Sequence, residues 1–241
     1  MQAENTSRSS SNPAVYRVVL AGVLTSLTVL MALVPSVGLI PVPSPAAHAT
    51  LLHIPAIVGA ILGGPIVGML VSSTFGIMSF LVATTPMFKD PAVAILPRVF
   101  IGLAAWAAYA GAARADRRAL QILAVLVSVI LAWFAWQVHG VYPIVGWAVL
   151  VAAIAAGAAL VYLVRGGRTD TVAVLVAAVV GTFTNTALVL GMASLLGYLP
   201  RAGVFLIATT HGIPEAIVGA VVVTAVVGAV RGTGRRQKSS L

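Results

Sequence analysis

The sequence has no cysteine among its 241 residues and very few charged ones. Without cysteine there is no disulfide framework, no thiol nucleophile and no thiolate metal site. Charged residues make up 8% of the chain, whereas an average soluble domain carries about a quarter. The low charge therefore excludes an ordinary soluble domain.

Recognisable catalytic motifs are also missing. The string HGIPE is not the zinc-protease pattern HExxH, and the chain has neither a G-x-S-x-G elbow nor a phosphate-binding loop. We therefore expect no enzyme activity, no metal and no cofactor on this chain, so any ATP-driven work falls to another subunit. The pair His211 and Glu215 is the one feature that favours an intramembrane enzyme.

Apolar residues dominate instead, at 60% of the chain, with a mean hydropathy of +1.08. The formal net charge is +9, but the basic residues occupy short polar breaks between apolar runs instead of one recognition face. That distribution is typical of cytoplasmic loops in membrane proteins. It predicts a multi-pass protein of the cell membrane that does not bind nucleic acid.

The apolar runs predict about eight membrane segments. A straight helix needs about 20 residues to cross the hydrocarbon core, and the second run is shorter, because Gly63-Gly64-Pro65 ends it. A short helix is tolerated in a membrane when protein buries it. The runs cover 16–35, 53–63, 65–84, 93–113, 119–137, 143–164, 171–196 and 206–230.

Charge decides whether 53–84 forms one segment or two. With two segments, both termini are cytoplasmic and the arginines of 114–118 and 165–168 lie on the same side as the termini. A single merged segment moves those arginines to the opposite side, against the positive-inside rule. The three Pro-rich connections 35–50, 84–92 and 197–203 then face outward, where irregular loops suit a binding mouth.

Polar side chains inside the apolar runs predict a ligand site, because such groups usually face a protein interior or a watery cavity. Arg98 either reaches the interface along its apolar stem or holds a ligand carboxylate with paired hydrogen bonds. Glu215 either pairs with Arg98 or accepts hydrogen bonds from ligand hydroxyl or amide groups. His211 precedes Glu215 by four residues and shares its helix face.

Two further segments contribute polar candidates. Asn185 lies in the outer half of its run, level with Glu215, and its amide both donates and accepts hydrogen bonds. Thr184 beside it either binds ligand or bonds back to its own helix. His53 opens the short second run and is either structural or a ligand contact.

Small residues at four-residue spacing form two faces. Gly64, Gly68, Ser72 and Gly76 form one ridge, which favours close helix packing. The second face, on the first helix, packs within the chain or docks a partner subunit; its residues are Ala21, Gly22, Thr25 and Ser26.

Four strings, in order, resemble the substrate-binding S components of energy-coupling factor (ECF) vitamin transporters, and most of all their pantothenate-type branch. They are HIPAIVGAILGGPIVGMLVSSTFGIMSF, LPRVFIGL, GTFTNTALVLG and GIPEAIV, within residues 51–103 and 178–220. The resemblance implies an all-α membrane protein with six core helices that captures a vitamin from outside. It also implies a coupling subunit and two cytoplasmic ATPases as partners, with docking through the first-helix positions Ala21, Gly22, Thr25 and Ser26. The chain lacks the family's clean Ala-x-x-x-Ala there.

The expected organisation has five parts. They are a disordered polar N-terminus (1–15), four core segments (16–113), an inserted two-helix hairpin (114–169), two more core segments (170–230) and a basic cytoplasmic tail (231–241). The hairpin departs from the family pattern, although a pair of segments preserves the topology.

The first functional hypothesis is an S component for a water-soluble vitamin or precursor, with pantothenate as the single best candidate. In it Arg98 meets the carboxylate, while Asn185 and Glu215 meet amide and hydroxyl groups. The alternative is a stand-alone secondary transporter in which Glu215 carries the coupling proton.

Overall fold

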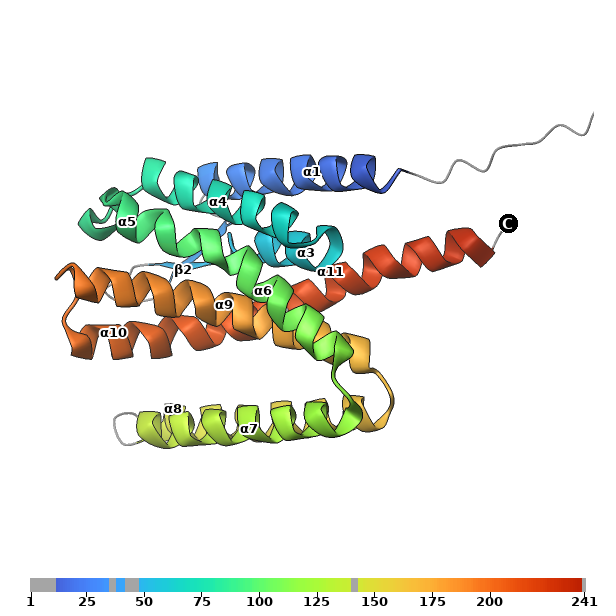
Figure 1. Cartoon of the computed structure of the whole chain (residues 1–241). Coiled ribbons are helices and arrows are strands. Elements are labelled where there is room, and N and C mark those ends of the chain that lie inside the picture. Colours follow the sequence, from blue (N-terminus) through green and yellow to red (C-terminus); the bar gives the residue numbers. More distant parts are fainter. Residues whose placement is uncertain (1–11, 35–37, 42–47, 140–142, 240–241) are drawn as a thin grey trace, which may run out of the picture.

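The computed structural model describes residues 12–34, 38–41, 48–139 and 143–239, which fold almost entirely into helices (Figure 1). Among these described residues, four helical spans are long and apolar enough to cross a membrane: Pro13–Leu33, Pro91–Arg114, Thr169–Leu195 and Glu215–Gly232. The long helices are α1 (Pro13–Leu33), α4 (Pro65–Leu81), α6 (Leu96–Arg114), α7 (Arg117–His139), α8 (Pro143–Arg165), α9 (Thr169–Leu195) and α11 (Ile213–Ser239).

The short helix α3 (Ile54–Gly63) lies at the centre of the core. Nine of its ten residues are buried, and it contacts α1, α4, α6, α9 and α11. It is separate from α4, as the glycine-proline break predicts, because Gly64 takes a φ of 92° that favours glycine. A helix too short to cross a bilayer is thus enclosed by protein on all sides.

The small-residue ridge of α4 packs against α6. A Cβ on Gly102 would overlap the backbone of Gly68, and a Cβ on Gly76 would meet Ile95 Cα at 3.0 Å. Between them, the Ser72 hydroxyl donates a hydrogen bond to the Val99 carbonyl at 3.2 Å. This confirms the packing interpretation for all of the ridge except Gly64, whose Cβ position has no neighbour within 4 Å.

The helices run roughly parallel to one another, so the molecule has two ends (Figure 1). The inner end, as we use the term, carries the start of α1, the end of α11 and the connections α6–α7 and α8–α9; the outer end carries the small elements described below. At the inner end Arg231 pairs with Asp170 at 2.5 Å, and Tyr109 donates a hydrogen bond to Asp170 at 2.9 Å. These contacts join α6, α9 and α11.

The hairpin α7–α8 packs chiefly on itself and meets the rest of the chain at its base. There Leu120 and Val164 of the hairpin join Ala112, Val172 and Ala173 in one buried cluster. Figure 1 shows the hairpin as a pair of helices set off from the other elements. Trp133 and Trp136 of the hairpin are 60% and 66% exposed.

The structure corrects several expected boundaries. The first helix begins at Pro13 instead of residue 16, and the last helix continues to Ser239 instead of ending at 230. The outer connections contain elements that the apolar pattern did not predict: strands β1 (Leu39–Pro41) and β2 (His48–Thr50), the 3-10 turn η1 (Pro86–Lys89), and helices α5 (Pro91–Ala94) and α10 (Arg201–Ile207). The two strands pair antiparallel.

Candidate ligand-binding site

His53 lies in a buried polar contact at the start of α3. The side chain is fully buried, and its Nε2 lies 3.0 Å from the Thr182 hydroxyl of α9. The Thr182 hydroxyl also donates a hydrogen bond to the Ala178 carbonyl at 2.9 Å. Gly219 of α11 covers the pair, since a Cβ there would lie 3.1 Å from Thr182 Oγ1. Three helices therefore meet at this histidine.

Glu215 lies in the first turn of α11 and is 5% exposed. Its Oε1 accepts a hydrogen bond from the Thr50 backbone amide at 2.5 Å. Thr50 is the last residue of β2, so this carboxylate ties the outer β-hairpin to the last helix. A buried carboxylate that receives a hydrogen bond has part of its desolvation cost offset.

A π-helical turn, Ala208–Gly212 (labelled η2), precedes Glu215. Pro214 lacks the N–H that would continue the α-helical ladder, which accounts for wider winding just before it. His211 within the turn is 4% exposed, and Gly212 faces Thr186 of α9, whose Cγ2 would lie 3.2 Å from an added Cβ. Turns of this kind occur often at functional sites.

Arg98 is buried near the start of α6, with 3% of its surface exposed, so the interpretation that it reaches the interface is wrong. Its Nη1 donates hydrogen bonds to the carbonyls of Val93 at 3.3 Å and Ala94 at 2.6 Å. The rings of Phe75 and Phe88 lie 4.8 and 5.0 Å from the guanidinium carbon, within the cation–π range. The charge is thus held by main-chain carbonyls and aromatic rings.

Asn185 faces the interior from α9 and is 5% exposed, and its Oδ1 is buried without a hydrogen-bond partner among the described residues. Thr184 has a different environment: it is half-buried, and its hydroxyl donates to the Val180 carbonyl at 2.7 Å. The structure therefore places Asn185 with the buried polar residues and gives Thr184 a contact within its own helix.

Electrostatics connects these positions. The charge of Arg98 acts on both Glu215 and His53, yet Arg98 and Glu215 do not form an ion pair. The structure therefore brings His53, Arg98 and Glu215 into one region, with Asn185 and His211 on the neighbouring turns of α9 and η2. We call these five residues the polar cluster. No group of three or more metal-ligating side chains occurs in the part of the chain that the structure describes.

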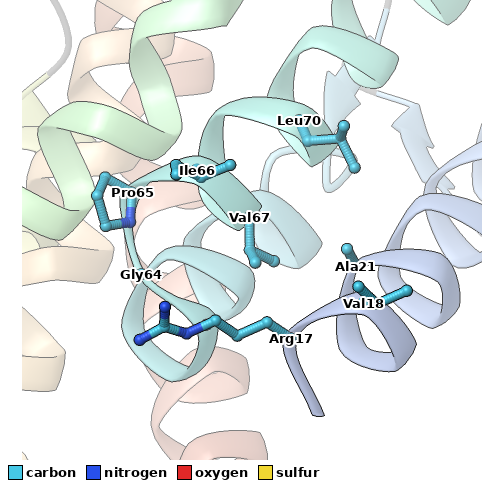
Figure 2. Close-up of a pocket in the computed structure, with 9 residues that line it drawn as sticks. Arg17, Val18, Ala21, Gly64, Pro65, Ile66, Val67 and Leu70 are labelled. Carbon is cyan, nitrogen blue, oxygen red and sulfur yellow. The ribbon is translucent and has the colours of Figure 1, made fainter. Parts of the chain in front are cut away.

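The first helix presents its small residues in two ways. Gly22 and Ser26 are exposed, and an added Cβ on Gly22 would meet no atom within 4 Å. Ala21 and Thr25 are half-buried. Ala21 lines a groove of about 250 Å³ between the start of α1 and the α3–α4 corner, with Arg17 and Gly64 at its rim (Figure 2).

A family model described as "ECF transporter, substrate-specific component" matches residues 16–227. The chain belongs to this family. A search of curated proteins finds no match. The family accounts for the apolar helices and makes the chain a component of a transporter.

Within this S component, sequence reasoning missed four residues that contact the polar cluster. Thr182 holds His53, Gly219 covers both, and Phe75 and Phe88 flank Arg98. Thr182 lies within the string GTFTNTALVLG, and Phe88 lies within the connection 84–92. The sequence alone did not indicate the direction in which each of these side chains points.

Proposed function

We propose that this S component captures a water-soluble vitamin or vitamin precursor in a cavity open to the outside, with pantothenate as the first candidate. Membership of the family supports a substrate-binding role. The polar cluster supports the location of the ligand site, because Arg98 and Asn185 each have a buried polar atom without a partner among the described residues. Such atoms are costly unless a ligand or water satisfies them.

The chemistry of the polar cluster suits a ligand with a carboxylate and further hydrogen-bonding groups. Arg98 supplies a cation, Asn185 an acceptor, and Glu215 an acceptor that already holds β2. Pantothenate carries a carboxylate, an amide and two hydroxyls, which match these groups. In the assembled transporter the chain spans the cell membrane about eight times with both termini in the cytoplasm.

Delivery depends on partners in this proposal. A transmembrane coupling subunit docks on the exposed small residues of α1, Gly22 and Ser26, with Ala21 and Thr25 at the edge of the contact. Small residues allow the close helix approach that such docking needs in a bilayer, where apolar burial alone gives no driving force. Two cytoplasmic ATPases supply the energy, and this chain binds no ATP.

Binding by the purified chain in detergent tests the proposal. We expect one compound of a vitamin panel, pantothenate first, to bind with nanomolar to low-micromolar Kd. Because hydrogen bonds to charged groups contribute about 1.5–3 kcal/mol, Arg98→Ala or Glu215→Gln should weaken binding by roughly 10- to 100-fold.

Arg114→Ala, which alters an exposed arginine at the inner end of the same helix, is the matched control and should bind normally. If no compound of the panel binds, the vitamin assignment is rejected. Uptake in vesicles without coupling and ATPase subunits, abolished by Glu215→Gln, would instead support a proton-coupled transporter.

A further inference from the structure

The guanidinium of Arg98 is already occupied on one side. Its Nη1 carries two N–H groups, and Nη1 donates to two carbonyls, Val93 and Ala94, at the end of α5. An anion that approached the Nη1–Nη2 edge end-on would have to displace at least one of these bonds. That edge is therefore closed to a ligand while α5 keeps its place.

The opposite side of the same group is unsatisfied. Arg98 Nε is buried and has no hydrogen-bond partner among the described residues. The aromatic rings of Phe75 and Phe88 lie over the guanidinium, where it has no N–H to donate. Of the two edges on which a guanidinium binds a carboxylate with paired hydrogen bonds, the Nε–Nη2 edge is the one left for a ligand.

We propose that Arg98 binds its ligand side-on, through Nε and Nη2, and that the ligand group is a carboxylate, with Phe88 as a positioning residue. This inference rests on the proposed function and names the chemistry of one contact within it. A carboxylate has the planar pair of oxygens that the edge requires. Arg98 is the one cation among the buried residues of the described chain, so a singly charged carboxylate suits the site better than a phosphate dianion.

A further unsatisfied atom of the polar cluster narrows the chemical class of the ligand. Asn185 Oδ1 is an acceptor without a donor in the described chain, so the ligand should bring an N–H or O–H group as well as its carboxylate. A molecule with an acid group alone would satisfy Arg98 and leave Asn185 unpaired. The expected class is therefore a small monocarboxylate that also carries an amide or hydroxyl.

Phe88 belongs to an outer segment that is anchored independently of any ligand. Asp90 caps α5 by accepting from the Ala92 amide at 2.8 Å, and it also accepts from the Tyr198 hydroxyl at 3.1 Å. Met87 and Val93, on either side, are buried against Val189 and Ala193 of α9. The segment thus holds both the ring and the carbonyls that fix the orientation of Arg98.

Nitrogen NMR of the arginine side chains tests the binding edge directly. The Arg98 Nε–H signal is identified by its loss in Arg98→Lys, and ligand is then added to the wild-type chain. Side-on binding predicts a large shift of this signal and slower exchange of its proton with water. The probes are the vitamin that binds from the panel and, separately, propionate with propanol as its uncharged counterpart.

Each outcome decides between the two proposals. A response to propionate but to no vitamin would retain the side-on carboxylate contact and reject the vitamin assignment. A vitamin that binds while the Nε–H signal stays unchanged would overturn the side-on contact and retain the capture function. If no carboxylate shifts the Arg98 Nε–H signal, the side-on contact is also overturned.

Affinity measurements test the roles of Arg98 and Phe88. Lysine keeps the charge but lacks the planar fork, so Arg98→Lys should weaken carboxylate binding by about 10-fold or more, whereas Arg114→Lys should not. Phe88→Leu should weaken it by roughly 3- to 10-fold, with Phe88→Tyr restoring most of the loss. For an analogue in which an alcohol replaces the acid, Phe88→Leu should have no effect, and an equal loss with both ligands would reduce Phe88 to a structural role.

Discussion

At the scale of single residues, the interior polar groups are held by main-chain atoms more often than by one another. Arg98 donates to two carbonyls at the end of α5, Glu215 accepts from the Thr50 amide, and Thr182 donates to the Ala178 carbonyl. Main-chain partners do not change with side-chain substitution, so each polar side chain is fixed by the fold itself. In the proposed site, groups fixed in this way would be pre-organised for a ligand, which lowers the entropic cost of binding.

Tyr198 and Asp90 give a residue-scale prediction about pH. The pKa of Tyr198 lies above its ordinary value near 10, because the phenol donates a hydrogen bond to the Asp90 carboxylate and its ionised form would face that charge. The contact therefore stabilises the outer segment below pH 10 and is lost as pH rises through the raised pKa. Asp90→Asn, which keeps an oxygen to cap α5 but removes the charge, should return the pKa of Tyr198 toward its ordinary value.

Phenolate absorbance, taken as the difference between each chain and its Tyr198→Phe variant, measures this pKa. Identical titration curves with and without Asp90→Asn would contradict the contact.

At the scale of helices and strands, the closest approach is between α4 and α6. Gly68 and Gly102 face each other so closely that a Cβ on Gly102 overlaps the backbone of Gly68. Backbone cannot rotate away as a side chain can, so the two helices would have to separate. The polar cluster depends on this pairing, because Arg98 lies in the first turn of α6.

Gly102→Ala should therefore lower the free energy of unfolding by about 1–3 kcal/mol, the usual cost of overpacking. Gly111→Ala on the same helix is the matched control, since an added Cβ there meets no atom within 4 Å, and it should be neutral or slightly stabilising. Unfolding by a denaturing detergent in mixed micelles measures both. Equal stability of the two variants would show that the helices separate without cost.

The sequence predicted long elements well and local orientation poorly, for a physical reason. Bilayer thickness fixes the length of an apolar helix, so α6 and α9 were placed to within a few residues. Because α9 is apolar around its whole circumference, no periodicity indicated its rotation, and Thr184 was chosen where Thr182 contacts His53. Strands of three residues, such as β2, have no detectable period, and β2 is held by β1 and by a residue distant in sequence, Glu215.

At the scale of the whole molecule, the chain consists of a core around α3 and a hairpin joined at one end. The core holds the polar cluster, while α7 and α8 contact it chiefly through the inner-end residues Leu120 and Val164. Tyr109 donates a hydrogen bond to Asp170 at 2.9 Å. The segments before and after the hairpin are therefore already close to each other. We therefore expect the core to keep its shape without the hairpin.

Replacing residues 117–166 with a short glycine-serine linker should leave ligand affinity unchanged. The surfaces uncovered at Ala112, Val172 and Ala173 are apolar and would contact lipid at little cost, because lipid tails are as apolar as the side chains they replace. Binding assays on the full and shortened chains, with circular dichroism to confirm helicity, measure the effect. Loss of affinity in a folded shortened chain would give the hairpin a part in the site.

The hydrogen bond between Thr50 and Glu215 also has a consequence for folding during synthesis, because it can form only after both of its partners have been made. Its partners are 165 residues apart, and at 5–20 residues per second the ribosome needs roughly 8–33 s to travel that distance. Throughout that interval, β2 has left the ribosome but the carboxylate that holds it has not. The outer β-hairpin is therefore fastened last, when the final helix inserts, and a nascent chain halted before that helix would contain Arg98 and Asn185 but no closed site.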